Sequence, residues 1–263
     1  MHTKIDADNP YGYDRYGFAW QQVSACGAAH LDFGCGDGRF LVGLRDKGIG
    51  RLVGADVSQE AVRLAKAACG EIEIMHVDGQ TDLSFNDGEF SSISLLDVLE
   101  HVDEPDALLA ELHRVLREEG TLIVTVPGQH VFSVLDVGNL KFRFPRLHRR
   151  FYCRRHSREE YDRRYAANPE GLVGDISAKK RWHEHFSRRK LAAVLNSNDF
   201  SAAEFDGAGL FMRILKAAEL TIGRFGPLRA VIRRIMAWDA CCFESANLFC
   251  IARKRAACAK DSK

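Results

Sequence analysis

The stretch Ala29–Gly38, which reads AHLDFGCGDG, decides the fold of this chain. It opens with a short apolar run and closes with glycines at alternate positions, Gly34, Gly36 and Gly38. The apolar run predicts a buried strand, and the glycines let the backbone turn sharply and come close to a ligand. A helical pattern follows at once over 39–47. The stretch therefore predicts a strand, a tight turn and a helix in succession.

Strand and helix patterns alternate along the first half of the chain. Further strands are predicted at 51–56, 72–77, 90–96 and 121–126, and helices over 58–69 and from Asp103-Pro105 to Gly120. This alternation is typical of a parallel, doubly wound sheet, whose ligands bind beyond the carboxyl ends of the strands. Two late strands, 202–206 and 246–251, complete a seven-stranded mixed sheet. The predicted fold class is thus α/β, with an insert after strand 5 and a helical pair between strands 6 and 7.

Acidic residues follow several of the predicted strands. The glycine spacing is G-x-G-x-G, unlike the G-x-G-x-x-G of a dinucleotide loop, and Asp32 and Asp37 would repel a phosphate. The turn therefore suits a ligand with cationic groups. Asp56 can accept hydrogen bonds from both hydroxyls of a ribose, and Asp78, before Gly79, can accept one from an adenine amino group.

These motifs together resemble a known family. LDFGCGDG, the acid at Asp56, VDG at 77–79, FSSISLLDVLEHV and GTLIVTVP are similar to class I S-adenosylmethionine-dependent methyltransferases, in particular the ubiquinone and menaquinone methyltransferase subgroup. The resemblance covers 29–127, and a weaker similarity to the family is found in HEHFSRRKLAAVL at 183–195. It implies a Rossmann-like methyltransferase fold and S-adenosylmethionine as cofactor.

The resemblance also implies roles for individual residues. The methionine part of the cofactor would be surrounded by Asp32 and the backbone at Gly34, Cys35, Gly36 and Gly38. Asp56 would hold the ribose, with Val57 against the adenine, Asp78 and Gly79 at the adenine edge, and the backbone near Leu96 close to the sulfonium. GQTD at 79–82 departs from the family pattern, which loosens the adenine assignment.

Two histidines are candidates for a catalytic base. His101 comes just after the fourth predicted strand, and His185, with His183, precedes a helix that Ser187 can cap. A packing or capping role is the alternative interpretation of each. A metal site is not expected, because the His-Glu-His spacing lacks a third ligand nearby.

The net charge of +1 conceals a segregation along the chain. Residues 1–140 hold 10 Lys and Arg against 23 Asp and Glu, whereas 141–190 hold 16 against 6 and 191–263 hold 11 against 7. In 141–165, aromatic residues alternate with basic ones. This composition suits anionic lipid or a lipid-linked pyrophosphate, with nucleic acid a less favoured partner and a solvated basic surface the structural alternative.

We expect a single domain in four parts: an N-terminal lid segment at 1–28, a cofactor-binding core at 29–127, a basic insert on the acceptor side at 128–190, and a C-terminal part at 191–263. The aromatic-rich start could instead be a surface helix docked on the core. The helical pair at 209–240 is basic and amphipathic, and fits a peripheral membrane anchor, a lid, a homodimer interface or a hairpin packed on the core.

The expected function is methyl transfer to a small-molecule, glycan or lipid-linked acceptor, which is anionic, with oxygen as the preferred atom. RNA methylation and a cofactor-binding partner subunit without catalysis are the alternatives. A start without an apolar run and eight cysteines without metal spacing predict a cytoplasmic protein with buried thiols, peripheral to the inner face of the membrane if 209–240 is an anchor.

Overall fold

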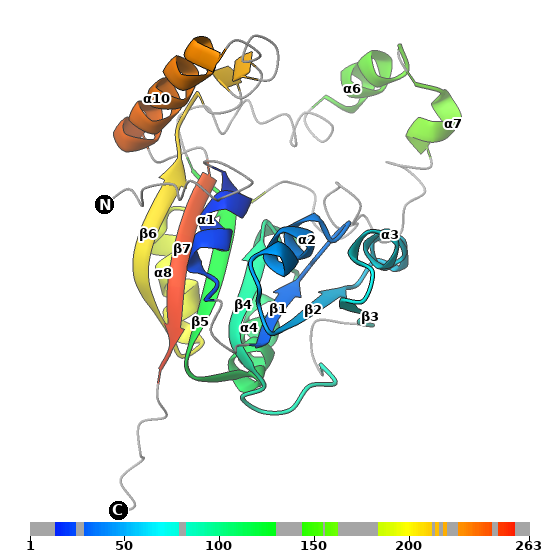
Figure 1. Cartoon of the computed structure of the whole chain (residues 1–263). Helices are drawn as coiled ribbons and strands as arrows, with labels where there is room; N and C mark the ends of the chain where they lie inside the picture. Colours follow the sequence, from blue (N-terminus) through cyan, green and yellow to red (C-terminus); the bar gives the residue numbers. More distant parts are fainter. Residues whose placement is uncertain are drawn as a thin grey trace, which may run out of the picture.

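The computed structural model describes residues 14–24, 29–78, 83–129, 144–154, 156–162, 184–211, 214–215, 218–219, 226–243 and 247–255. Its centre is a seven-stranded sheet with the order β3-β2-β1-β4-β5-β7-β6 (Figure 1). The strands are β1 (Ala29–Phe33), β2 (Arg51–Asp56), β3 (Glu73–His76), β4 (Phe90–Leu96), β5 (Leu116–Pro127), β6 (Phe200–Ala208) and β7 (Asn247–Lys254). Strands β1 to β5 pair in parallel, and β7 runs antiparallel between β5 and β6. The predicted mixed sheet is confirmed.

The strand order reverses between β1 and β4. From β1 the chain moves outward to β2 and β3, then returns to place β4 on the other side of β1. At such a reversal the loops after the two strands separate, and a ligand can lie between them. The carboxyl ends of β1 and β4 are therefore where a site is expected.

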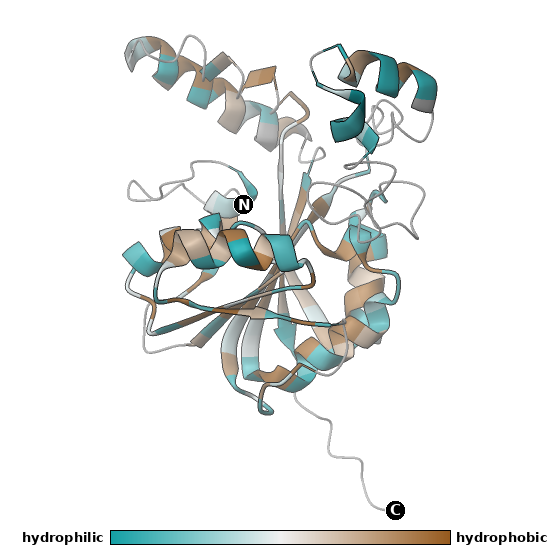
Figure 2. Ribbon diagram, turned by 90° about the vertical axis from the view of Figure 1, so that its right-hand side faces the viewer, coloured by the Kyte–Doolittle hydropathy of each residue, from teal (hydrophilic) through white to brown (hydrophobic). Residues whose placement is uncertain are grey.

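Helices cover both faces of the sheet (Figure 2). Side chains of α4 (Pro105–Val115) and α8 (Arg188–Ser197) belong to the hydrophobic core on one face. Those of α1 (Arg15–Gln22), α2 (Arg39–Asp46), α3 (Gln59–Cys69) and α10 (Gly226–Phe243) belong to the core on the other. A 3₁₀ turn, η1 (Leu99–His101), follows β4, and the insert carries α6 (Pro145–Tyr152) and α7 (Arg158–Tyr161).

Short polar side chains start several of these helices. Ser58 accepts a hydrogen bond from Ala61 N at the start of α3, and Ser187 accepts one from Lys190 N at the start of α8. Each cap satisfies a backbone N–H that has no partner within the helix. Both caps were predicted from the sequence.

The prediction that Gly120 ends the helix that begins at Asp103-Pro105 is wrong. Helix α4 ends at Val115, and the chain enters β5 at Leu116, which is buried and pairs with Phe90. Burying the leucine in the sheet favours the strand over another helical turn. Gly120 instead lies in an irregular stretch of β5, where an added Cβ would come within 2.6 Å of Leu116 Cγ.

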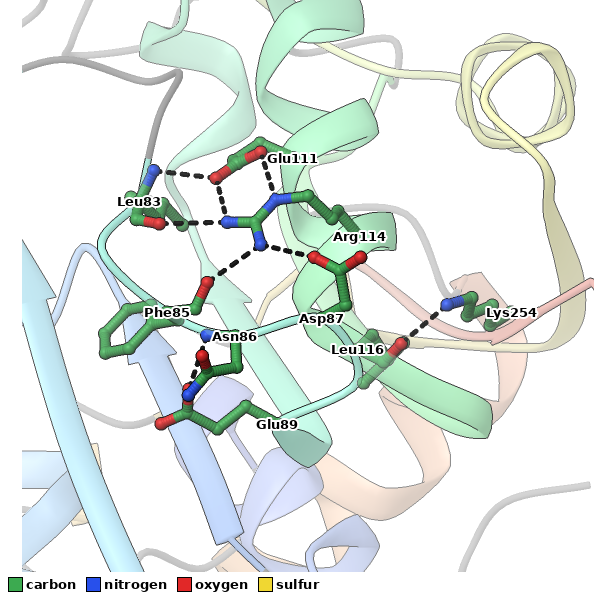
Figure 3. Close-up of polar contacts among 9 residues, drawn as sticks. All are labelled: Leu83, Phe85, Asn86, Asp87, Glu89, Glu111, Arg114, Leu116 and Lys254. Carbon is green, nitrogen blue, oxygen red and sulfur yellow. Dashed lines mark hydrogen bonds and ion pairs between the residues drawn. The ribbon is translucent and has the colours of Figure 1, made fainter.

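Arg114 ties the segment before β4 to α4 (Figure 3). Its guanidinium donates to both carboxylate oxygens of Glu111 at 2.6 and 2.9 Å and to the carbonyl oxygens of Leu83 and Phe85 at 2.9 and 2.8 Å. It also pairs with Asp87 at 2.7 Å. One side chain thus holds the connection that leads into β4.

The two late strands, β6 and β7, pair antiparallel in the sheet, although α10 lies between them in the sequence. Gly226-Pro227, where the sequence pattern separates the two helices of the predicted pair, begins α10, because proline is well tolerated in a first helical turn. Most of the first member of the predicted pair lies outside the described residues. In the described part of the chain, no helix is long and apolar enough to cross a membrane.

Five cysteines are described as free thiols. Cys35, Cys69 and Cys250 are buried, as predicted, whereas Cys153 is half-buried and Cys242 is exposed on α10. The expectation of buried thiols is therefore wrong for Cys242.

Candidate cofactor and active site

The glycine turn after β1 is held between two neighbouring elements. Gly34 N and Cys35 N both donate to the carbonyl oxygen of Ala55 in β2, at 2.7 and 3.1 Å. An added Cβ at Gly34, where φ is +78°, would lie 2.4 Å from Val98 Cγ2. At Gly36 an added Cβ would meet no atom within 4 Å. The turn is thus packed at its start and open at its middle, where a ligand could approach its backbone.

Asp56 is the carboxylate that joins β2 to this turn. It is buried at the end of β2, where Oδ2 accepts from Gly36 N at 2.8 Å and Oδ1 accepts from Ser58 N at 2.9 Å. A carboxylate has about four acceptor positions, so each oxygen can accept one more hydrogen bond. The two free positions match the two hydroxyls of a ribose.

Asp32 is a second buried carboxyl, at the end of β1. Ser94 Oγ, from β4, donates to its Oδ1 at 2.6 Å. Burial raises the pKa of Asp32 to about 7, although Ser94 and Arg15 act in the opposite direction. Asp32 therefore lies at the strand reversal with a proton that can be lost near neutral pH.

A buried histidine continues this polar chain. His30, fully buried in β1, has Nδ1 2.8 Å from Ser92 Oγ and Nε2 3.0 Å from Ser94 Oγ. Burial lowers the pKa of His30 to about 3. The sequence reasoning missed these residues. Its available signal was the alternation of polar residues at 30 and 32, and at 92 and 94, within otherwise apolar strands.

The end of β4 is joined to the N-terminal helix. Asp97, directly after Leu96, has a φ of +57°, and its Oδ1 accepts from Thr125 Oγ1 at 2.8 Å. Its Oδ2 forms an ion pair with Arg15 of α1. Burial opposes the charge on Arg15, but Asp97 and Tyr16 raise its pKa on balance.

Helix α1 also packs on the core. Phe18, Ala19 and Trp20 are buried, and the ring of Phe18 stacks on that of Phe249 in β7 with centroids 5.0 Å apart. The described part of the N-terminal segment is thus the docked helix that the sequence allowed. Residues 1–13, which would complete a lid, lie outside the described residues.

His76 links the two residues predicted on the adenine side. Its Nε2 donates to the carbonyl oxygen of Val57 at 3.0 Å, and its Nδ1 lies 3.2 Å from Asp78 Oδ1. Asp78 is exposed, and Gly79 lies outside the described residues. The sequence reasoning did not single out His76.

The two candidate bases lie near the carboxyl ends of the adjacent strands β4 and β5. His101 ends η1, and its Nε2 lies 3.9 Å from Oε1 of the fully buried Glu100. His185 precedes Phe186, whose backbone bonds Pro127 and Gln129 at the end of β5. Both histidines are half-buried, and His183 lies outside the described residues. The structure therefore places both at the carboxyl edge of the sheet.

One hollow lies away from the carboxyl edge of the sheet. A hollow at the amino ends of β2 and β3, lined by residues such as Arg51 and Glu73, includes none of the predicted site residues. Among the described residues, no group of three His, Cys, Asp or Glu side chains could hold a metal ion.

Known proteins share this architecture. Residues 31–124 match the family model described as a methyltransferase domain. A ubiquinone biosynthesis O-methyltransferase from Dechloromonas aromatica is 25% identical over 123 residues, which are 44% of this chain and 53% of that protein. A protein of 37.1 kDa in a Streptomyces fradiae transposon is 37% identical over 106 residues, 38% of this chain and 30% of that protein. The chain thus spans about half, or less, of the length of these curated relatives.

Solved structures extend the likeness of fold to most of the chain. A Thermotoga maritima S-adenosylmethionine-dependent methyltransferase, described as a possible histamine N-methyltransferase, has a TM-score of 0.55 at 16% identity over 94% of this chain and 92% of its own. A Synechocystis magnesium protoporphyrin IX methyltransferase with bound S-adenosylhomocysteine has a TM-score of 0.52 at 15% identity, covering 91% and 80%.

A doubly wound sheet whose glycine turn is bonded to a carboxylate of the next strand defines a nucleoside-binding α/β domain. Residues 31–124 therefore form a methyltransferase domain similar to those of class I S-adenosylmethionine-dependent methyltransferases, a family whose cofactor is S-adenosylmethionine.

Proposed function

We propose that the protein transfers a methyl group from S-adenosylmethionine to an oxygen of a small-molecule, glycan or lipid-linked acceptor. The observation that carries this proposal is the bond from Gly36 N to Asp56 Oδ2, which joins the open glycine turn to the predicted ribose acid. The preference for oxygen rests on the relatives named as O-methyltransferases.

The residues present fit the cofactor. The turn at Gly36 is open, and the two buried carboxyls, Asp32 and Asp56, suit a ligand that carries an ammonium group and a ribose. Asp32 and the backbone at Gly34, Cys35, Gly36 and Gly38 would hold the methionine part, and Asp56 the ribose. Val57, Asp78 and Gly79 would hold the adenine, and the backbone near Leu96 would lie by the sulfonium.

The chain's main tasks are to orient the acceptor and to exclude water. When bound, the cofactor supplies a methyl group already activated on a sulfonium, and orientation can supply about 7–11 kcal/mol of barrier reduction. The buried ends of β1, β2 and β4 provide a dry wall for this, since Phe33, Ala55 and Leu95 are 2% exposed or less.

An oxygen acceptor must also lose its proton. His101 is the proposed base, because it lies at the carboxyl edge with the Glu100 carboxyl 3.9 Å from Nε2, where it can stabilise a positive charge on the ring. His185, which lies near the end of the neighbouring strand β5, is the second candidate.

The acceptor side is proposed to face an anionic, membrane-proximal compound. Helices α6, α7 and α10 lie beyond the carboxyl ends of the strands in both views (Figures 1 and 2). Exposed apolar side chains form one stripe on α6 and another on α10. The stripes consist of Phe144, Leu147 and Phe151, and of Leu228, Val231, Ile235 and Trp238. Arginines Arg146, Arg150 and Arg154 accompany the first stripe and Arg234 the second, which suits an anionic surface.

Calorimetric titration with S-adenosylhomocysteine tests the proposal. We expect wild type to bind, and Asp56→Ala to lose at least about tenfold in affinity, which corresponds to about 1.4 kcal/mol. Asp37→Ala is the matched control, because Asp37 is an exposed acid of the same turn that pairs with Arg39.

The same series tests the base. His101→Ala should bind as wild type does, yet lower kcat by about 10²–10⁴-fold with an accepted oxygen compound. Absence of binding in wild type would refute the cofactor assignment. An unchanged kcat would remove His101 as the base.

A further inference from the structure

Four polar side chains of β1 and β4 form a buried, hydrogen-bonded chain next to the glycine turn that follows β1. Ser92, His30, Ser94 and Asp32 alternate between β4 and β1, with successive distances of 2.8, 3.0 and 2.6 Å. Their exposed fractions are 5% or less. The parallel register creates the chain, because it pairs His30 with Ser92 and Asp32 with Ser94.

Each hydroxyl in the chain has one proton to donate, so the protons are ordered. When Asp32 is a carboxylate, Ser94 donates to it and accepts from His30 Nε2–H, and His30 Nδ1 then accepts from Ser92. When Asp32 is protonated, it can donate to Ser94, whose own proton turns to His30 Nε2, and the ring proton moves to Nδ1. The ionisation of Asp32 and the tautomer of His30 are therefore coupled.

We propose that His30, acting through Ser94, sets whether Asp32 is a carboxylate or a neutral acid, and that cofactor binding at Asp32 releases to solvent the proton that the neutral form of Asp32 holds. This inference rests on the proposed function, since it takes the cofactor's ammonium group as the charge that Asp32 meets. His30 is here a positioning residue: it does not touch the cofactor, and it acts through Ser94.

The charged groups around these four side chains act on the ionisation of Asp32 in opposite directions. Asp56 of β2 disfavours a carboxylate at Asp32, whereas Arg15 of α1 favours it. The thiols of Cys35 and Cys69 stay protonated, because burial raises their pKa values and Asp32 adds to this. Burial keeps His30 neutral, and Lys47 of α2 acts in the same direction. Because the pKa of Asp32 is raised to about 7, both its carboxylate form and its neutral form are populated near neutral pH.

Nitrogen NMR of the wild-type protein tests the coupling without any activity. The His30 ring signals, assigned by their loss in His30→Val, should change from the Nδ1–H to the Nε2–H tautomer as pH rises through about 7, and S-adenosylhomocysteine should shift this change to lower pH. A His30 tautomer that is constant over this range would overturn the proposal.

Binding measurements test the consequence. Titration of S-adenosylhomocysteine into wild type at about pH 7, in buffers of different ionisation enthalpy, should show release of about half a proton per molecule bound. Ser94→Ala removes the hydrogen bond to the charged form of Asp32, so affinity should fall about tenfold near pH 6 and recover near pH 9.

Ser91→Ala is the matched control. Ser91 is the buried serine of β4 next to Ser92, and it donates to the Ala29 carbonyl oxygen, which is not part of the hydrogen-bonded chain from Ser92 to Asp32. It should keep the wild-type pH profile. Binding by Ser94→Ala with the wild-type profile, or binding without proton release, would contradict the inference. If wild type binds no S-adenosylhomocysteine, the proposed function fails, whereas the NMR titration of the free protein still decides the coupling.

Discussion

At the scale of the residue, two buried groups of β1 oppose each other in the pH dependence of stability. The folded state raises the pKa of Asp32 from 3.8 to about 7, so it keeps a proton that the unfolded chain loses, and stability falls as pH rises through this window. The folded state lowers the pKa of His30 from 6.5 to about 3, so stability from this group is lost as pH falls toward 3. Between about pH 4 and 6.5 the two contributions cancel.

Single substitutions should uncover each contribution. Relative to wild type, the free energy of unfolding of His30→Val should fall by about 1.4 kcal/mol per pH unit from about pH 4 to 6.5, because Asp32 alone then titrates. For Asp32→Asn it should rise by a similar amount, because His30 alone then titrates. Urea unfolding across this range measures both, and Ser91→Ala should run parallel to wild type. Slopes of the same sign in the two variants would contradict the assignment.

At the scale of the element, the position of a strand's carboxyl end depends on contacts at the opposite end of that strand. Strand β4 carries Ser94 and Leu96 to the site, and its entry is held by Arg114 of α4. The fork of a guanidinium is needed there, because it meets both oxygens of Glu111 and two carbonyl oxygens at once. A lysine presents a point charge and cannot reproduce that geometry.

Arg114→Lys should therefore destabilise the protein. Loss of two to three hydrogen bonds and the unsatisfied carbonyl oxygens of Leu83 and Phe85 predict a decrease of about 2–3 kcal/mol in the free energy of unfolding. Arg63→Lys is the control, since Arg63 forms an exposed pair with Glu60 one turn away and should leave the urea midpoint of unfolding close to that of wild type. Equal effects of the two substitutions in urea unfolding would show that the Arg114 contacts do not hold β4.

At the scale of the whole molecule, apolar stripes and the candidate site share one side. Helix α10 buries Ile232 and Met236 against the core, while Trp238, which is 66% exposed, belongs to the stripe beside them. Phe151 on α6 is 55% exposed, with the guanidinium of Arg154 5.1 Å from its ring. An aromatic and basic surface of this kind favours the headgroup region of an anionic bilayer.

Vesicle binding tests this surface. Wild type should co-sediment with phosphatidylcholine vesicles that contain phosphatidylglycerol, less so at high salt, and Trp238→Ser should weaken this at least about tenfold, because burial of such a side chain supplies more than about 1.4 kcal/mol. Ala237→Ser, at an exposed position of α10 outside the stripe, is the control.

Other partners would give different results. Dimers that dissociate in Trp238→Ser, without vesicle binding by wild type, would identify the stripe as an interface between two copies of the chain. Salt-sensitive RNA binding by wild type, without vesicle binding, would support the alternative of an RNA acceptor.

The sequence by itself determined the alternation of strands and helices, the glycine turn and the acids at the ends of β1 and β2. These follow from local patterns, since periodicity, capping residues and glycines act over a few neighbouring residues. It also led to a wrong helix end at Gly120, because burial of Leu116 against β4 overrode the local signal.

Only the tertiary structure decided which distant residues meet. The side-chain bonds between β1 and β4 join residues 62 or 64 positions apart, and the Arg15–Asp97 pair spans 82. The sequence showed polar residues alternating at 30 and 32 and at 92 and 94. It did not show that these two sets of side chains face each other. Strand order and register arise from how the whole core packs, and a one-residue shift would turn these side chains to the opposite face.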